Sequence, residues 1–329
     1  MPIPESILYL SEGDVQNTLT VAEAVDLAEK GIKADSAGEV NGDKFYMDVS
    51  DNGFIKPFSG YIEGEQYAFV KSFSYFPGNP EKYNRPTTSS QVILIDAETG
   101  LPACFMGADW VTGLKTASST VVTASYLARP ESENVTIFGA GTLGRLHLKA
   151  LSKRFDLKQA YFVDIIPDVA ETCAADLENE LGFQVEAVTL EDRESAVRVS
   201  DIIFTVTTGN QELVYKDWLK PGTFIARLGS YQEVALDVIT GADKVVLDRW
   251  KYVSPRIPEV IQLVKEGKFS QESVHAEWPD IVAGKVPGRE SGDEIIVFIA
   301  LGIWGEYAAI LPEVYRRARS LGLGIELPF

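Results

Sequence analysis

The hydrophobic pattern of residues 1–125 predicts one helix followed by several short strands. Apolar residues recur at helical spacing within 20–34, and Thr20 with Glu23 three places later forms a capping-box signature at the start of this segment. Three strand-like runs follow, at 45–49, 67–75 and 91–96. The small residues of 116–128 then predict a helix that packs closely against a neighbour. Together these elements predict a mixed α+β domain.

The pattern changes at 129–134, where Pro130 and its polar or charged neighbours predict a domain boundary. Beyond this point apolar runs alternate with helical stretches, which is typical of βαβ units in a doubly wound parallel sheet. The apolar runs lie at 134–138, 159–164, 183–188, 201–207, 224–229 and 244–248. The final part, 293–324, contains a long helix pattern that ends at glycines. We expect this helix to pack back on the first domain.

Composition supports a chain of two globular domains. The 329 residues are 45% hydrophobic and 24% charged, which is ordinary for folded proteins of two domains. The 48 acidic and 30 basic residues give a net charge of −18. This balance disfavours nucleic acids and anionic membranes as partners, because both attract basic surfaces.

Cysteine and histidine usage gives no sign of a disulfide framework or a metal centre. Cys104 and Cys173 are isolated thiols, which favours a reducing compartment, and His147 and His275 are more typical of structural residues than of catalytic ones. The first fifteen residues lack the pattern of a secretory signal, and no run of 18 apolar residues is present. We therefore expect a cytoplasmic protein with no metal.

The segment VTIFGAGTLG carries the strongest motif of the chain. An apolar strand pattern is followed by Gly139, Gly141 and Gly144, which form the GxGxxG fingerprint of dinucleotide-binding folds. The first glycine permits a tight turn, the second lets the backbone approach a pyrophosphate, and the third lets the following helix pack on the sheet. Thr142 and Leu143 belong to the same predicted cofactor loop.

A second strand pattern ends at Asp164, 20 residues beyond Gly144. An acidic residue at this point is expected to bind the adenosine ribose, and its charge repels a 2′-phosphate. Arg145 and Lys158 could weaken that repulsion, but the pattern favours NAD over NADP. A domain of the same class with incidental glycines is the alternative interpretation.

Several stretches together resemble the ornithine cyclodeaminase/mu-crystallin family, which includes archaeal-type alanine dehydrogenases and imine or ketimine reductases. The resemblance covers essentially the whole chain in order. The matching stretches are VKSFSYFPGNP (70–80), QVILIDAETGLPACFM (91–106), WVTGLKTASSTVVTASYLA (110–128), the glycine loop, VYKDWLKPGTFIARLGS (214–230), IVAGKVPGRESGDEIIVF (281–298) and VYRRARSLGLG (314–324).

The resemblance implies a Rossmann domain combined with a discontinuous α+β domain for substrate binding and dimerisation. The α+β domain would comprise 1–128 with 303–329, and the NAD-binding domain 129–302. It also implies a homodimer.

The resemblance further implies the positions of substrate and cofactor residues. Lys71 matches the substrate-site lysine of the family. With apolar Val70 and Phe73 nearby it can be partly buried, and the lowered pKa would make it a proton donor or imine partner. Lys115 and Lys44 stand where family members carry arginines that bind a substrate carboxylate. Lysine keeps the charge but loses the bidentate fork, so Arg85 is a further candidate for the same task. Next to the nicotinamide the resemblance places Thr207, Gly229 and Ser230.

One departure from the family pattern bears on the reaction. Cyclodeaminases carry an aspartate after the glycine of the fifth strand, where this chain has Ser230 and Tyr231. Glu233 could replace that aspartate only if the loop is rebuilt. Leu143 replaces a glutamine of many members, and Tyr307 replaces an acidic residue that is common after the glycine near 302.

These observations favour an NAD-dependent oxidoreductase that acts on a C–N bond of a small anionic amino acid, its imine or its 2-oxo acid. Hydride transfer belongs to the cofactor, while the protein orients the reactants and neutralises charge. One alternative is an ornithine cyclodeaminase that forms proline and ammonia with bound NAD. Another is a non-enzymatic, mu-crystallin-like protein that binds NAD(P) and a ligand.

Overall fold

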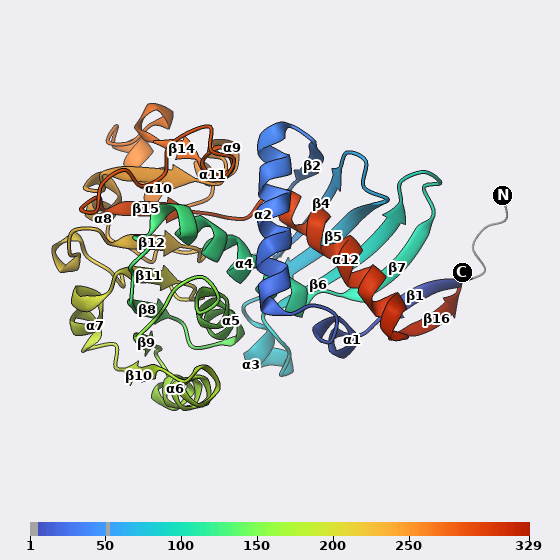
Figure 1. Cartoon of the computed structure of the whole chain (residues 1–329), viewed down its shortest axis with the longest axis horizontal. Coiled ribbons are helices and arrows are strands. Elements are labelled where there is room, and N and C mark those ends of the chain that lie inside the picture. The colour runs from blue at the N-terminus through green and yellow to red at the C-terminus, as the bar shows by residue number, and fades with distance from the viewer. Residues whose placement is uncertain (1–5, 51–52) are drawn as a thin grey trace. The chain divides into compact units, whose positions relative to one another are not determined.

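The computed structural model describes residues 6–50 and 53–329. The chain divides into two compact units, shown in Figure 1. Unit 1 comprises Met1–Ser119 and Trp304–Phe329, and unit 2 comprises Thr120–Ile303. The division falls within helix α4 (Asp109–Leu127), so one continuous helix contributes residues to both units.

Unit 1 is built on a mixed, eight-stranded sheet in the order β16-β1-β7-β6-β5-β4-β2, with β3 paired to β4. Its strands are β1 (Ser6–Leu10), β2 (Val40–Lys44), β3 (Met47–Ser50), β4 (Gly53–Ile62), β5 (Tyr67–Tyr75), β6 (Thr88–Asp96), β7 (Pro102–Gly107) and β16 (Ile325–Pro328). Buried and exposed residues alternate along β5 and β6, as expected for a sheet with one covered face. The β1–β7 pair is parallel and the other pairs are antiparallel.

Two long helices of unit 1 pack against each other, α2 (Val21–Ala37) and α12 (Gly305–Leu321). The predicted capping box is present at the start of α2, where Thr20 and Glu23 bind each other's backbone N–H. Gly31 and Gly305 meet at the crossing: a Cβ on Gly31 would lie 2.2 Å from the Gly305 carbonyl oxygen. Only residues without a side chain allow the two backbones to approach this closely.

Helix α4 begins at Asp109, seven residues before the predicted start at 116. The Glu12 carboxylate accepts hydrogen bonds from the backbone N–H of Asp109 at 2.8 Å and of Trp110 at 2.9 Å. Glu12 therefore caps the helix from almost a hundred residues away in the sequence, which a local pattern does not reveal. The short helices α1 (Glu12–Gln16) and α3 (Asn79–Tyr83) complete unit 1.

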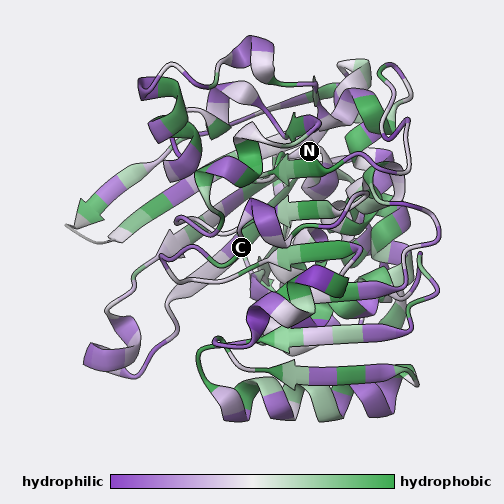
Figure 2. Cartoon of the chain, turned by 90° about the vertical axis from the view of Figure 1, so that its left-hand side faces the viewer, coloured by the Kyte–Doolittle hydropathy of each residue, from purple (hydrophilic) through white to green (hydrophobic). Residues whose placement is uncertain are grey.

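Unit 2 contains an entirely parallel, eight-stranded sheet in the order β10-β9-β8-β11-β12-β15-β13-β14. Its strands are β8 (Asn134–Phe138), β9 (Gln159–Val163), β10 (Gln184–Val188), β11 (Ile202–Thr205), β12 (Phe224–Arg227), β13 (Lys244–Leu247), β14 (Ala276–Glu277) and β15 (Ile296–Ile299). Figure 2 shows the central strands as hydrophobic over most of their length, as expected for strands covered on both faces.

The connections between these strands are mainly helical, which confirms the predicted α/β fold class. The helices are α5 (Thr142–Leu151), α6 (Pro167–Leu181), α7 (Arg193–Val199), α8 (Leu236–Thr240), α9 (Trp250–Val253), α10 (Pro258–Lys265) and α11 (Trp278–Val282). Among residues 6–50 and 53–329, no helix is both long enough and apolar enough to cross a membrane.

Candidate functional site

The strand order of unit 2 brings the predicted cofactor residues to one edge of the sheet. From β8 the chain runs outward through β9 and β10, then returns to the other side of β8 as β11 and β12. The direction of winding therefore reverses between β8 and β11. In open parallel sheets, ligands bind at such a switch point, outside the carboxyl ends of the strands. The glycine loop follows β8, Thr207 follows β11, and Gly229 follows β12.

The glycine loop has the geometry that its sequence predicts. Gly139 adopts φ +103, a conformation that L side chains rarely adopt. A Cβ on Gly144 would lie 1.9 Å from the Gly139 carbonyl oxygen, so only glycine lets α5 pack here. Gly141 is the N-cap of α5 and provides no side-chain cap, and the space where its Cβ would stand is open to 4 Å. The first-turn N–H groups of α5 thus form a cradle that fits a pyrophosphate.

Asp164 stands directly after β9, close to this loop. Its Oδ2 accepts a hydrogen bond from the Ala140 backbone N–H at 2.8 Å, and its Oδ1 accepts one from Ile166 at 3.1 Å. The two cations that could weaken its charge bind elsewhere: Arg145 pairs with Asp176, and Lys158 pairs with Asp156. Neither cation therefore pairs with the Asp164 carboxylate, which is available to bind a ribose beside the loop.

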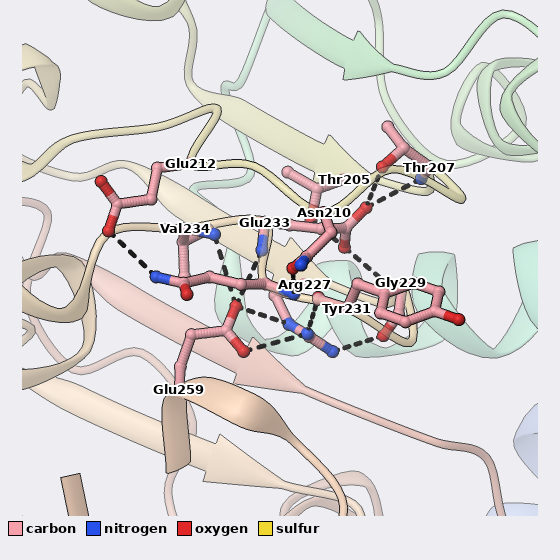
Figure 3. A network of polar contacts seen from close by, with 11 residues as sticks. Thr205, Thr207, Asn210, Glu212, Arg227, Gly229, Tyr231, Glu233, Val234 and Glu259 are labelled. Atoms are coloured by element: carbon pink, nitrogen blue, oxygen red, sulfur yellow. Dashed lines mark hydrogen bonds and ion pairs between the residues drawn. The ribbon is translucent and has the colours of Figure 1, made fainter. Parts of the chain in front are cut away.

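The loops after β11 and β12 are held by one buried carboxylate, that of Glu233 (Figure 3). Its Oε1 accepts hydrogen bonds from the backbone N–H and the hydroxyl of Thr207, both at 2.8 Å. Its Oε2 accepts them from the Thr205 hydroxyl at 2.8 Å and from the Gly229 N–H at 2.7 Å. Each oxygen thus binds two donors, and the carboxylate fixes two loops at the switch point.

Arg227 and Glu259 support this arrangement from below (Figure 3). Both side chains are fully buried, and the Arg227 guanidinium binds the Glu259 carboxylate through contacts of 3.0 and 3.1 Å. Arg227 also donates to the carbonyl oxygens of Gly229 and Tyr231, and Glu259 accepts from the Glu233 N–H at 2.9 Å. A buried ion pair with these additional hydrogen bonds rigidifies the loop that contains Gly229.

This network answers whether Glu233 replaces the aspartate of the cyclodeaminases. All the hydrogen bonds of its carboxylate point to the protein's own backbone and hydroxyl groups, so Glu233 is a positioning residue and not a free acid or base. Ser230 lies exposed on the same loop, and Tyr231 is partly exposed. The sequence predicted Thr207 and Gly229 at this edge. It did not predict that Glu233 and Arg227 hold the loops that contain them.

A second polar site lies on the covered face of the unit 1 sheet. The register aligns five side chains across five strands: Lys44, Phe58, Lys71, Val92 and Met106. Lys71 is only 1% exposed, in a row whose other members are largely apolar.

Aromatic rings surround the Lys71 ammonium group. Its Nζ lies 5.0 Å from the ring centres of Phe58 and Tyr307 and 5.3 Å from that of Phe73. Its hydrogen bond to the Ser90 hydroxyl measures 3.3 Å. Ring faces stabilise a buried cation but replace only part of the hydration that it has lost.

Lys115, on α4, contacts the Tyr307 ring of the same cluster. Its Nζ lies 4.9 Å from the Tyr307 ring centre and forms a buried salt bridge of 2.9 Å with Glu306. Glu306 Oε1 also accepts a hydrogen bond from the Ser119 hydroxyl at 3.1 Å. Lys115 is therefore neutralised by a carboxylate of the chain itself, which the sequence did not suggest.

The environment changes the proton affinity of Lys71. Burial lowers the pKa of Lys71 well below its ordinary value, and the neighbouring charges of Lys56 and Lys115 lower it further, whereas Asp109 raises it. A lysine with a lowered pKa exchanges protons near neutral pH more readily than an exposed one. Lys71 is thus a candidate for acid–base chemistry.

The other predicted substrate residues lie at different places in unit 1. Lys44 is buried two strands from Lys71 in the same row, whereas Arg85 is exposed on the loop after α3. The structure also adds Lys56, whose Nζ lies 4.9 Å from the Phe73 ring centre. The sequence did contain a signal that Lys56 lies near this cluster. Lys56 and Phe58 are two residues apart on β4, and residues two apart share one face of a strand.

His147 is structural, as its sequence context suggested. It is fully buried on α5, with Nδ1 bonded to the Leu143 carbonyl at 2.7 Å and Nε2 to the Thr120 hydroxyl at 3.2 Å. Burial lowers the pKa of His147 to about 4. The ring is therefore neutral at physiological pH.

The parallel sheet, its switch point and the glycine loop define unit 2 as a dinucleotide-binding fold of the Rossmann class. The model of the ornithine cyclodeaminase/mu-crystallin family matches residues 6–322. The chain belongs to this family, as the resemblance of its sequence stretches indicated.

Several relatives are similar over most of the chain. N-((2S)-2-amino-2-carboxyethyl)-L-glutamate dehydrogenase of Staphylococcus aureus is 33% identical over 76% of this chain and 74% of its own length. Pyrroline-2-carboxylate reductase of Thermococcus litoralis, solved in complex with NADH and L-proline, is 28% identical with a TM-score of 0.93. An archaeal alanine dehydrogenase, solved as a dimer with bound NAD, is 28% identical with a TM-score of 0.91. The two structures match 98% of this chain and 100% and 99% of their own chains, respectively.

Proposed function

We propose that this protein is an NAD-dependent oxidoreductase that interconverts a small anionic amino acid with its imine or 2-oxo acid. The observation that carries the proposal is Lys71, a lysine only 1% exposed that is enclosed by aromatic rings and bonded to a hydroxyl. Such a group can donate a proton to a substrate nitrogen, or accept one from it. The relatives with NAD or NADH bound support the choice of chemistry.

The residues of unit 2 fit NAD. The uncapped first turn of α5, with Gly141, Thr142, Leu143 and Gly144, would hold the pyrophosphate, and Asp164 would bind the adenosine ribose. The loops fixed by Glu233, with Thr207, Gly229 and Ser230, would border the nicotinamide. NAD supplies the hydride chemistry when bound.

The residues of unit 1 would bind the substrate. Lys71 exchanges the proton at the reacting nitrogen, and Lys44 supplies positive charge for a substrate carboxylate. Lys115, whose charge is balanced by Glu306, contributes N–H donors to the same substrate carboxylate. Arg85 is a weaker candidate because its side chain lies on an exposed loop. In this proposal unit 1 is the substrate-binding and dimerisation domain, and unit 2 is the NAD-binding domain.

The test is a screen for oxidation or formation of NADH with a panel of amino acids, cyclic imines, and 2-oxo acids paired with ammonia or methylamine. We expect net NADH change with at least one pair and a weaker response with NADP(H). Ammonia release from ornithine is measured in parallel. Ammonia without net NADH change would establish a cyclodeaminase instead. Tight NAD and ligand binding without any turnover would establish a binding protein.

We further propose that the protein is a homodimer that pairs through the outer face of the unit 1 sheet. Side chains on this face form an apolar row across five strands: Ile325, Tyr9, Phe105, Ile93 and Val70. Ile325, Ile93 and Val70 are 61%, 39% and 41% exposed, which is unusual for neighbouring large apolar residues. The alanine dehydrogenase solved as a dimer supports a dimeric state, and the exposed apolar row is the reason for choosing this face.

Light scattering after size-exclusion chromatography tests the dimer. We expect a dimer for the wild type and a monomer for Val70→Glu combined with Ile93→Glu, because two charges would then face the interface. A wild-type monomer would refute the proposal.

The free, buried thiols of Cys104 and Cys173 support a cytoplasmic location, where thiols stay reduced.

A further inference from the structure

Lys71 is buried, yet an acid–base residue must exchange its proton with solvent in every catalytic cycle. Lys71 and its hydrogen-bond partner Ser90 are 1% and 2% exposed, so water has little direct access to the Nζ atom. The rings of Phe58 and Phe73 have no exchangeable proton, and burial raises the pKa of the Tyr307 phenol, so this phenol releases its proton reluctantly. Other groups are therefore better suited to carry protons to Lys71.

Ser90 connects Lys71 to a carboxylate. The Ser90 hydroxyl lies 3.3 Å from Lys71 Nζ on the covered face of β6. The Asp109 carboxylate lies near the same serine, whose hydroxyl and backbone N–H act to lower the pKa of Asp109. A bond of 3.0 Å from the Ala108 N–H to the Ser90 carbonyl fixes the start of α4 against β6 at this point.

The outer end of this series lies at the surface. Asp109 is an exposed residue at the first turn of α4, while Ser90 and Lys71 lie progressively inside. Burial and the nearby Glu12 carboxylate raise the pKa of Asp109, so this carboxyl group holds a proton more readily than an ordinary aspartate. The other charged or titratable groups that influence Lys71 are Lys56 on β4, Lys115 on α4 and Tyr307 on α12.

We propose that Asp109 and Ser90 form a proton relay that carries protons between solvent and the Lys71 amine. The proposal rests on the role of Lys71 in the oxidoreductase proposed above. A hydroxyl suits this position because it donates one hydrogen bond while it accepts another. With Lys71 charged, its ammonium donates to the Ser90 hydroxyl, and rotation of that hydroxyl would direct its own proton toward the Asp109 carboxylate.

The proton balance is as follows during reduction of an imine. Lys71 gives a proton to the substrate nitrogen and becomes a neutral amine. The Asp109 carboxylate takes a proton from water. The Ser90 hydroxyl then donates its own proton to the neutral Lys71 amine and receives the proton from Asp109, so Lys71 ends charged and Asp109 ends as a carboxylate, as both began. In amino acid oxidation each transfer runs in reverse.

The first experiment measures, without any substrate, whether the Asp109 carboxylate influences the titration of Lys71. In protein labelled with ¹³C at the lysine Cε, the Lys71 signal is identified by its loss in Lys71→Arg, and its titration is followed by NMR. We expect Asp109→Asn to lower the Lys71 pKa by about one unit, because a nearby negative charge is removed. Ser89→Ala is the matched control, since Ser89 is next in sequence and its hydroxyl bonds Gln91 at 2.7 Å. An unchanged Lys71 titration in Asp109→Asn would overturn the relay.

The second experiment follows turnover. Ser90→Ala should lower kcat roughly tenfold with little change in KM, because recharging of Lys71 becomes limiting. The solvent isotope effect on kcat of Ser90→Ala should increase, and small acids such as imidazole should restore part of its rate. Ser90→Thr keeps a hydroxyl and should retain most of the wild-type kcat. A Ser90→Ala enzyme with wild-type kcat and isotope effect would also overturn the relay. If the wild type turned over no substrate, the proposed function would fail, while the titration would still decide the contact.

Discussion

Replacing Glu233 by glutamine tests whether one carboxylate organises the cofactor edge of unit 2. An amide has one acceptor oxygen, whereas the carboxylate uses both oxygens to bind two donors each. If the amide nitrogen replaces Oε2, the Gly229 N–H loses its acceptor, and if it replaces Oε1, the Thr207 N–H does. The hydroxyls of Thr205 and Thr207 can rotate, but the backbone N–H groups cannot.

The cost follows from these bonds. A buried N–H without an acceptor costs about 1–3 kcal/mol, and the remaining bonds lose the contribution of a charged acceptor. We expect Glu233→Gln to lower the free energy of unfolding by about 2–4 kcal/mol, or the Tm by about 5–15 °C. The loops after β11 and β12 should loosen, so the Kd for NADH should rise by roughly tenfold, equivalent to about 1.4 kcal/mol.

Urea unfolding followed by tryptophan fluorescence measures the stability, and titration of NADH fluorescence measures the affinity. Glu212→Gln is the matched control, because it removes the same charge nearby and can still accept the 2.9 Å bond from Gln232. We expect the control to lie within about 0.5 kcal/mol of the wild type. Wild-type stability and NADH affinity in Glu233→Gln would refute the positioning role of this carboxylate.

Three further predictions concern other buried or charged groups. Lys115→Met or Glu306→Gln alone should cost about 3–5 kcal/mol of stability in urea unfolding, because each removes one partner of a buried ion pair, and the double variant should cost less than the sum. Burial lowers the pKa of His147 to about 4 in the folded chain, whereas it is about 6.5 in the unfolded chain. Between these two pH values the unfolded chain binds a proton at His147 and the folded chain does not. Stability should therefore fall by about 3 kcal/mol as the pH drops through this range, and His147→Gln should remove that contribution, which unfolding at several pH values measures. Asp164→Ser should raise the Kd for NADH roughly tenfold and narrow the preference over NADPH in fluorescence titrations; an unchanged preference would contradict the role of Asp164.

Features determined by neighbouring residues were predictable from the sequence. The capping box of Thr20 and Glu23 needs only one helical turn, and the glycine loop needs only the strand before it and the helix after it. The alternation in 67–75 likewise placed Lys71 within a strand. In each case the physical cause acts over a few residues.

Features that depend on distant residues were not predictable in the same way. Glu12 sets the start of α4, and Glu306 pairs with Lys115 across most of the chain. The Glu233 carboxylate could be assigned its role only when the loops after β11 and β12 were seen to share it. Such contacts arise when the fold closes, and no local spacing encodes them.

The contact of α2 and α12 through Gly31 and Gly305 has a consequence for the surroundings of Lys71 and Lys115. Glu306 and Tyr307 directly follow Gly305, so the spacing of the two helices also sets how far the Tyr307 ring reaches over Lys71 and Lys115. An added methyl group at Gly31 would meet the opposite backbone and push the helices apart. The distance between the Tyr307 ring and the two lysines is thus adjustable from the opposite side of α12, by the size of one residue on α2.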